Sequence, residues 1–208
     1  MNLVLNFIYY RTFGTISFYY LWFMRPQKVD DEALLNSLFA VLRAKGYNGS
    51  TLNDFAKASG LQKPSLYHRF PGGKEEISSC VLNFVHQWIE QNIYDLLMDK
   101  TIPTNHRLKS VIKNINAVYN HGDSICLLRA LSMDAGIKVF GAQIKDGMGL
   151  WIKGFTNLGE DCGHPKNVAK AMAYQVLINI QGSLVVSKGL GSTGPFKAAL
   201  RSIKAMYL

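Results

Sequence analysis

The stretch SGLQKPSLYHRFPGGKEEI, residues 59–77, holds a short basic and aromatic segment between two sets of helix-ending residues. Gly60 ends the segment before it, and the Pro-Gly-Gly run at residues 71–73 ends the segment itself. Pro64 is compatible with a helix start, because a residue in the first turn has no intrahelical N–H bond to lose. The pattern therefore predicts a short helix over residues 63–70.

A second short helix is predicted just before this one. Ser50 or Thr51 is a suitable N-cap, apolar residues follow at helical spacing, and Gly60 is a left-handed stop. In the helix over 63–70, Leu66 and Phe70 are four residues apart and are expected to face inward. The side chains expected to face outward are Lys63, Ser65, Tyr67, His68 and Arg69. Two short helices joined by a Gly-containing turn, the second polar and basic outside, are typical of a helix-turn-helix that reads the DNA major groove.

Helical spacing of apolar residues continues over the rest of the chain. Residues 30–46 form an amphipathic pattern that starts with three acids and ends with Lys45 and Gly46. After the break at 71–73, one long helix is predicted over about residues 74–100. The remaining predicted helices cover about residues 105–119, 125–134, 138–158, 165–188 and 195–206. Since there is no hairpin signal, alternating strand or internal repeat, the fold is predicted to be all-α.

The composition is that of a globular protein with an excess of positive charge. The chain has 208 residues, 48% of them apolar, which suffices for one or two domains with a hydrophobic core. Its 23 Lys and Arg residues exceed its 14 Asp and Glu residues, and the net charge of +9 favours nucleic acid or an anionic membrane surface as partner. Cys80, Cys126 and Cys162 form no CxxC pair. An odd number of widely spaced cysteines indicates the reducing cytoplasm, so we expect a cytoplasmic protein.

Residues 1–23 differ from the rest, since they are rich in aromatic residues and carry one charge, Arg11. A membrane anchor requires about 20 unbroken apolar residues, and the uncharged run after Arg11 covers only residues 12–24. A secretory signal would need a basic start and a small-residue cleavage site, which this segment lacks. The interpretations left open are an extension upstream of a start at Met24, an additional docked helix, and a membrane anchor. We expect no membrane partner.

Residues 30–77 resemble the DNA-binding domain of the TetR family of bacterial repressors. The family pattern is a first helix ending in Gly-Tyr/Phe, a Thr-rich cap, an Asp-φ-Ala segment in which φ is apolar, Ala-Gly-φ, Leu-Tyr-x-His-Phe and a downstream Lys. This chain supplies Gly46-Tyr47, Ser50-Thr51, Asp54-Phe55-Ala56, Ser59-Gly60-Leu61, Leu66-Tyr67-His68-Arg69-Phe70 and Lys74. The SLYHRFPGGKEE run is similar to the LmrA/YxaF-like branch. Two positions depart from the pattern, with Arg69 at the usual His and Gln62 at the usual Ser or Thr cap.

The resemblance implies an N-terminal three-helix DNA-binding domain and a C-terminal helical domain that binds a small effector and forms a homodimer. We expect an extension at 1–23, a DNA-binding domain at 24–76 and an effector-binding and dimerisation domain at 77–208. Tyr67 and Lys74 would grip phosphates of a near-palindromic operator. The residues expected to contact DNA are Thr51, Lys63, Pro64, Ser65, Tyr67, His68, Arg69 and Lys74. Release of the repressor by a small-molecule effector is expected by the same resemblance.

The C-terminal half carries weaker signals. Residues 168–190 are apolar nearly all round and precede a helix with Phe196, Leu200 and Ile203 on one side, which is typical of two helices in a four-helix intersubunit bundle. A purely intramolecular core is the alternative. Large or polar residues on apolar helical stretches are the candidates for an effector pocket. They are Trp88, Tyr119, Trp151, Phe155, Met172 and Gln175, with Tyr94, Phe140 and Met148 as further candidates.

No catalytic or metal-binding pattern stands out in the sequence. The PGGK run at residues 71–74 lacks the GxxxxGK spacing and the following Ser or Thr of a nucleotide-binding loop. The His, Asp and Cys residues within 121–126 and 162–164 lack the spacing of a closed zinc site. We therefore expect neither an enzyme nor a metal or cofactor site. The alternative class is an enzyme or a membrane-associated interaction protein that keeps a vestigial helix-turn-helix.

Overall fold

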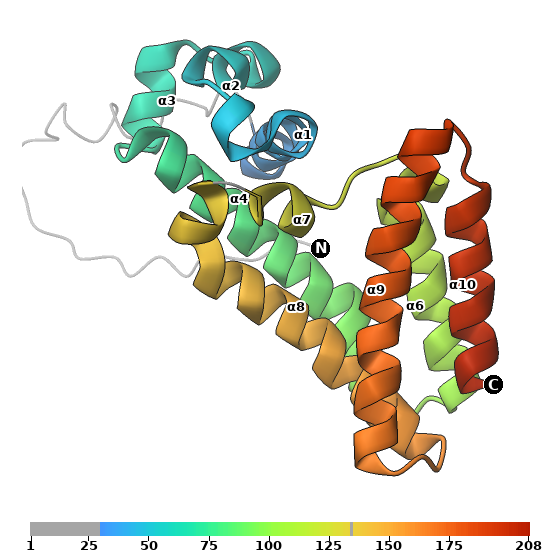
Figure 1. Ribbon diagram of the computed structural model, residues 1–208. Helices are drawn as coiled ribbons and strands as arrows, with labels where there is room; N and C mark the ends of the chain where they lie inside the picture. The colour runs from blue at the N-terminus through green and yellow to red at the C-terminus, as the bar shows by residue number, and fades with distance from the viewer. Residues whose placement is uncertain (1–29, 134) are drawn as a thin grey trace, which may run out of the picture.

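The computed structural model describes residues 30–133 and 135–208, and over these residues the chain is helical with no β-strand (Figure 1). The prediction of an all-α fold is confirmed. The three interpretations of residues 1–23 concern a segment outside the described residues.

Three helices form the N-terminal unit: α1 (Asp31–Gly49), α2 (Leu52–Ser59) and α3 (Lys63–Arg69). The side chain of Asp30 caps α1 by accepting hydrogen bonds from the backbone N–H groups of the next turn. Regular helical geometry in α1 breaks at Gly46, whose φ of 66° is the left-handed conformation that glycine adopts without strain. The predicted stop at this residue is therefore confirmed. Leu34, Leu38 and Leu42 on α1 are buried against the unit's core.

The long helix predicted over residues 74–100 is not continuous. It consists of α4 (Gly73–Ile89), a π-helical turn η1 (Glu90–Tyr94) and a short α5 (Asp95–Met98). Within the widened turn, the Asn92 side chain donates to the Trp88 carbonyl (3.0 Å), and the Asn92 carbonyl accepts from the Asn114 side chain (3.0 Å). A Cβ at Gly154 would lie 3.5 Å from the Tyr94 Cα, so α8 approaches the turn closely at that glycine. Distant residues therefore complete the turn, and no local breaker residue signals it.

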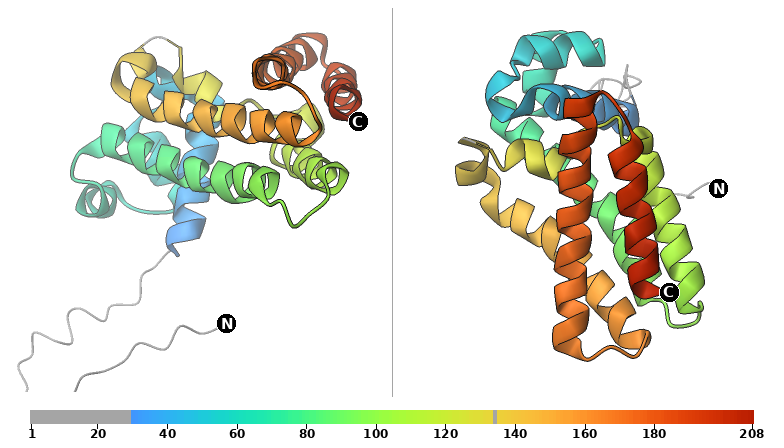
Figure 2. Two further views of the ribbon diagram at one scale, coloured as in Figure 1. Left: turned by 90° about the horizontal axis from the view of Figure 1, so that it is seen from below. Right: turned by 45° about the vertical axis from the view of Figure 1, so that its right-hand side comes forward.

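The remaining elements are α6 (Thr104–Val118), a 3-10 turn η2 (Asn120–Gly122), α7 (Leu127–Leu131), α8 (Ala135–Asp161), α9 (Lys166–Leu190) and α10 (Gly194–Tyr207). The views in Figures 1 and 2 show α4 and α8 running side by side from the N-terminal unit. The helices α6, α9 and α10 stand together at the other end of the molecule, away from α3. The arrangement separates the α2–α3 pair from a C-terminal lobe of three helices.

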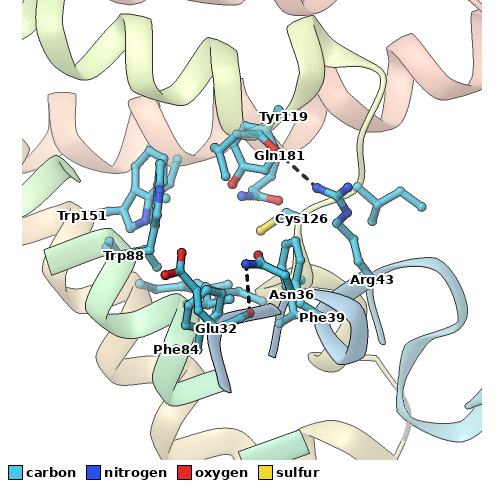
Figure 3. Close-up of a pocket in the computed structure, with 18 residues that line it drawn as sticks. Glu32, Asn36, Phe39, Arg43, Phe84, Trp88, Tyr119, Cys126, Trp151 and Gln181 are labelled. Atoms are coloured by element: carbon cyan, nitrogen blue, oxygen red, sulfur yellow. Dashed lines mark hydrogen bonds between the residues drawn. The ribbon is translucent and has the colours of Figure 1, made fainter. Parts of the chain in front are cut away.

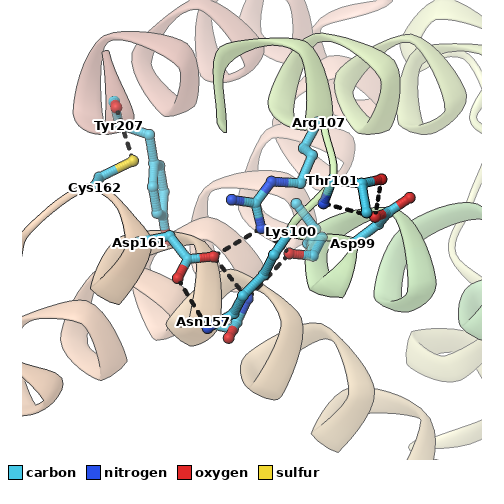
Figure 4. A network of polar contacts seen from close by, with 9 residues as sticks. Asp99, Lys100, Thr101, Arg107, Asn157, Asp161, Cys162 and Tyr207 are labelled. Atoms are coloured by element: carbon cyan, nitrogen blue, oxygen red, sulfur yellow. Dashed lines mark hydrogen bonds and ion pairs between the residues drawn. The ribbon is translucent and has the colours of Figure 1, made fainter. Parts of the chain in front are cut away.

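A polar network fixes the junction of α5, α6 and α8 (Figure 4). Arg107, only 3% exposed, donates to the Leu97 carbonyl (2.7 Å) and to the Asp161 carboxylate (2.8 Å). Asn157 donates to the same two acceptors at 3.1 Å and 3.2 Å, and Lys100 lies 3.4 Å from Asp161. Burial raises the pKa of Asp161, but hydrogen bonds and charges from Arg107 and Lys100 outweigh it, so the net pKa is lowered. The charged form of Asp161 is thus favoured in the folded state.

Because the folded-state pKa of Asp161 lies below its unfolded value, its stabilising contribution is present above about pH 4 and is lost as the pH falls through the folded pKa. We expect Asp161→Asn to lower the free energy of unfolding at pH 7 by roughly 3 kcal/mol, since it leaves a buried guanidinium without its counter-ion. The difference from the wild type should shrink below about pH 4. Urea denaturation between about pH 3 and 7 measures it, with the exposed Asp146→Asn as control. A difference that stays constant with pH would contradict this assignment.

Candidate functional site

Helix α3 presents an exposed polar and aromatic face. Leu66 and Phe70 point into the core, as the spacing predicted. Tyr67 is 50% exposed, which is a large apolar area for a seven-residue helix to leave in water. The other predicted DNA-contacting residues on this face are all exposed: Lys63, Pro64, Ser65 and His68. One side of α3 therefore faces outward, while the residues that pack in the core lie on its other side.

Arg69 differs from these residues in its surroundings. It is half-buried, and its guanidinium donates to the Asp31 carboxylate at the start of α1 (3.2 Å). The contact ties the end of α3 to the first turn of α1. Its expected contact with DNA stays a prediction, and a phosphate would compete with a carboxylate for the same guanidinium.

The turn before α2 is held by Thr51, which the sequence suggested as its cap. Its hydroxyl accepts from the Asp54 N–H (3.2 Å), and the Asp54 carboxylate accepts from the Thr51 N–H (2.9 Å), which together form a capping box. Lys45 also bonds to Asp54. Hydrogen bonds from Lys45 and Thr51 lower the pKa of Asp54 to about 2. Thr51 is exposed, so it remains available at the surface next to α3.

Lys74, expected to grip phosphate, also has a structural role. Its ammonium donates to the backbone carbonyls of Tyr47 (2.8 Å) and Ser50 (3.2 Å) and lies 4.3 Å from the centre of the Tyr47 ring. The Tyr47 ring in turn packs edge-on against Phe140 of α8, with centroids 5.1 Å apart. Lys74 therefore joins the start of α4 to the end of α1, and Tyr47 joins that end to α8.

A cavity of about 330 Å³ lies between α1 and the helices α4, α6, α7, α8 and α9 (Figure 3). Its lining from α1 follows one stripe at intervals of four, three and four residues: Glu32, Asn36, Phe39 and Arg43. The remaining lining residues are Phe84, Val85, Trp88, Ile89, Val118, Tyr119, Ile125, Cys126, Leu127, Leu128, Met148, Trp151, Leu177 and Gln181. None of the four α1 residues was predicted from the sequence, where residues 30–46 were described only as an amphipathic helix. The helical spacing of the four residues was the available signal.

Three of the six predicted effector residues, Trp88, Tyr119 and Trp151, line this cavity. Phe155 does not, because it is fully buried behind the wall, stacked on Trp151 at a centroid distance of 6.2 Å.

Met172 and Gln175 also lie outside the cavity lining. They are on the first half of α9, where Met172 packs partly against the core and exposed Gln175 donates to Asn179 (2.7 Å). The sequence could not separate them from Gln181, two turns further on, because side chains that face a cavity and side chains that face solvent follow the same periodicity.

The cavity combines aromatic walls with a few polar groups. Burial raises the pKa of Tyr119 well above its usual value, with Cys126 adding to the effect, so its phenol stays neutral. The Gln181 carbonyl oxygen is buried and has no hydrogen-bond partner among the described residues. Arg43 donates to the Val118 carbonyl (3.4 Å) at one end of the α1 stripe, and the Glu32 carboxylate is at the other. Such a site suits an apolar, partly aromatic molecule with a hydrogen-bond donor for Gln181.

Residues 30–133 and 135–208 contain neither a cluster suited to a metal ion nor a helix suited to a membrane. No three His, Cys, Asp or Glu side chains there are grouped so that they could hold a metal ion. Within the same residues, no helix has the length and apolar character needed to cross a membrane.

The exposed α3, its Gly60 turn and the attached helical lobe define a helix-turn-helix protein with a C-terminal helical domain. Residues 34–78 match the family of "Bacterial regulatory proteins, tetR family". This match covers α1 to the start of α4, the same part of the chain for which the sequence resemblance to the TetR family was noted.

Two curated relatives from Bacillus subtilis (strain 168) support this resemblance. The HTH-type transcriptional regulator LmrA is 31% identical over 94 residues, 45% of this chain and 50% of LmrA. The uncharacterized HTH-type transcriptional regulator YxaF is 29% identical over 94 residues, 45% of this chain and 49% of YxaF. The similarity therefore spans about half the length of each relative.

Solved structures show the same fold at low identity. A TetR transcriptional regulator from Legionella pneumophila has a TM-score of 0.75 at 19% identity, covering 88% of this chain and 100% of that one. A cysteine mutant of the TetR family regulator CifR, solved with a 26-bp double-strand operator DNA, has a TM-score of 0.69 at 18% identity, with coverage of 88% and 100%. At these identities the likeness establishes the fold.

The Lys74 contacts lead to a prediction about stability. We expect Lys74→Gln to lower the free energy of unfolding by about 1–3 kcal/mol, because it removes two charge-assisted hydrogen bonds and the contact with the Tyr47 ring. Lys63→Gln, on the exposed face of α3, should change it by less than about 0.5 kcal/mol. Equilibrium denaturation of both variants measures the difference. Equal stability of the two would refute the structural role of Lys74.

Proposed function

We propose that this protein is a transcriptional regulator that binds operator DNA as a homodimer and is released by an apolar small molecule. The observation that carries the proposal is the exposed face of α3 within a TetR-type helix-turn-helix. Lys63 is placed to reach guanine acceptors, Ser65 and Tyr67 to donate to phosphate, and Pro64 to contact a thymine methyl. Thr51 and His68, at the edges of the same face, extend it toward the DNA backbone. Access to operator DNA implies a cytoplasmic location.

The second copy would pair through the outer face of α9. Every residue of one stripe on this helix is exposed, at alternating intervals of three and four: Val168, Ala171, Gln175, Ile178, Gly182, Val185 and Gly189. Ile178 is 61% exposed, and a Cβ at Gly182 would meet no atom of the described residues within 4 Å. A seam of apolar and small residues at this spacing suits close packing against another helix. On α10, Ala198, Ser202 and Ala205 continue the same kind of surface.

The cavity suggests how a ligand would act on DNA binding. Its α1 stripe lies on the same helix as Leu34, Leu38 and Leu42, which hold the N-terminal unit together. A ligand that prefers a shifted α1 would therefore move α2 and α3 directly, in addition to any pivot of α4. Because two recognition helices fit successive major grooves only about 34–36 Å apart or a multiple of that, a small shift suffices to release DNA. The domain boundary at 76/77 would then separate the DNA-binding part of the chain from the dimerisation part. The cavity would be lined by residues from both parts.

Selection of operator DNA tests the first part of the proposal. We expect the dimer to select a near-palindromic sequence, and Lys63→Ala to lose about 1–3 kcal/mol of discrimination at one base pair per half-site. Lys145→Ala, an exposed change on α8, is the control and should leave both unchanged. Binding-site selection followed by gel shift at moderate salt measures these quantities. A stable dimer that shows no preference for any DNA sequence would contradict the proposal.

Ligand coupling tests the second part. A compound found by thermal-shift screening should bind about 5- to 150-fold more weakly when operator DNA is present, since coupling between two sites is reciprocal. Gln181→Leu should weaken that compound by about tenfold by removing the buried acceptor, whereas Gln87→Leu on the outside of α4 should not. Calorimetric titration with and without operator gives both values. Equal affinities in the two titrations would show that the cavity does not control DNA binding.

A further inference from the structure

Most of the excess positive charge lies outside residues 30–76, which include α1, α2 and α3. Residues 30–76 contain six basic and six acidic residues and are neutral overall. Residues 162–208, which include α9 and α10, contain six basic residues and no acidic one, and α6 likewise contains no acid. Since α6, α9 and α10 stand together at the end away from α3, the charge of the chain is concentrated in that lobe (Figures 1 and 2).

Three of these cations form a row on α10. Lys197, Arg201 and Lys204 follow each other at intervals of four and three residues, and all are exposed. Each immediately precedes one residue of the small stripe Ala198, Ser202 and Ala205, about 100° further round the helix. The cation row therefore flanks the surface proposed to meet the second copy. Within the described residues no carboxylate forms an ion pair with any member of the row.

A symmetric dimer has to bring this row near its own copy. In a two-fold contact the same patch is used by both subunits, so each α10 row meets or flanks the partner's α9 and α10. Neither α9 nor α10 contains an acidic residue that could pair with a cation of the other subunit. Helix axes in a bundle are about 8–10 Å apart. This distance is within the Debye length at about 0.1 M salt and far below the Debye length of roughly 30 Å at 0.01 M, so the cations of the two copies repel each other most strongly at low salt.

We propose that like charge in the α10 row, Lys197, Arg201 and Lys204, opposes dimerisation, so that salt strengthens the dimer while it weakens contacts with DNA phosphates. The inference rests on the proposed homodimer. Salt releases DNA because counter-ions compete for phosphate, and it favours the dimer because counter-ions screen the row. Operator binding therefore passes through a maximum at intermediate salt, since low salt leaves monomers that contact DNA without sequence preference.

A second copy suits this surface better than a nucleic acid or a membrane. Between the cations of the row, the outer face of α10 carries only alanine and serine, with no aromatic side chain to stack on a base or enter a bilayer interface. The neighbouring exposed residues of α9, Ile178 and Val185, form an apolar seam that a second copy would bury.

The dimer dissociation constant, measured by sedimentation equilibrium at about 20 mM and about 300 mM NaCl, tests the proposal. It should fall by about tenfold or more at the higher salt. The triple change K197Q/R201Q/K204Q should remove most of this dependence and tighten the dimer at low salt. The matched control K138Q/K145Q/K153Q, on α8, changes the net charge equally and should keep most of the dependence.

Charge inversion gives an independent readout. When K197E/R201E/K204E is mixed with the wild type at about 20 mM salt, native mass spectrometry should show more mixed dimer than the statistical half. A salt-independent dissociation constant, or equal effects of the two glutamine triples, would overturn the inference while leaving the dimer standing. Loss of binding to non-specific DNA or anionic vesicles, with unchanged dimer affinity, would assign the row to that partner instead. Absence of a dimer at every salt concentration would overturn the dimer proposal itself.

Discussion

The positions of α2 and α3 depend on the ammonium group of Lys74. Gly46 breaks α1, and the carbonyls of Tyr47 and Ser50 that follow it are no longer part of a regular helix. Lys74 satisfies both, and Ser50, itself buried, donates its hydroxyl to the Tyr47 carbonyl (3.0 Å). Because α2 begins two residues after Ser50, the same contacts fix where α2 and then α3 leave the unit. A lysine suits this position because its three donors can bind two carbonyls and still offer one to a phosphate.

The first helix belongs to two structures at once. One face, Leu34, Leu38 and Leu42, holds the N-terminal unit, and another lines the cavity. A helix transmits displacement along its length as a nearly rigid body, so the two faces move together. The Tyr47–Phe140 contact adds a second link, from the end of α1 to α8. One helix therefore joins the cavity wall to the N-terminal unit, with no long chain of intermediate residues between them.

Local signals in the sequence predicted most of the fold and part of the site. Gly60, Pro64 and the 71–73 run mark helix starts and ends through their backbone dihedral angles alone. The α2–α3 pair could therefore be predicted from the sequence. The π-helical turn at 90–94 was not, because it is completed by Asn114 and by the close approach at Gly154.

The cavity shows the same limit at the level of side chains. Trp88, Tyr119 and Trp151 were identified because they are large residues on apolar helices, and Phe155 satisfied the same rule yet lies behind the wall. Only the packing of α8 against its neighbours decides which of two stacked aromatic rings faces the space. The phosphate contact expected of Lys74 rests on the resemblance and stays a prediction, whereas its contacts with two carbonyls are visible only in the structure.

Net charge and the position of the charges point to different parts of the molecule. The value of +9 favours nucleic acid, yet the expected DNA-binding domain at 24–76 has eight basic and six acidic residues and contributes only +2, with acids at Asp30–Glu32 and Glu75–Glu76. In the proposed function, attraction to DNA would therefore depend on where Lys63 and Lys74 lie more than on the net charge of this domain. In the proposed dimer, the cations of the distal lobe would act on the contact between the two copies and so on whether two α3 helices are presented together. Binding to an operator with two half-sites requires both copies of the protein. A charge that lies far from the DNA can therefore change the affinity for the operator through its effect on the dimer.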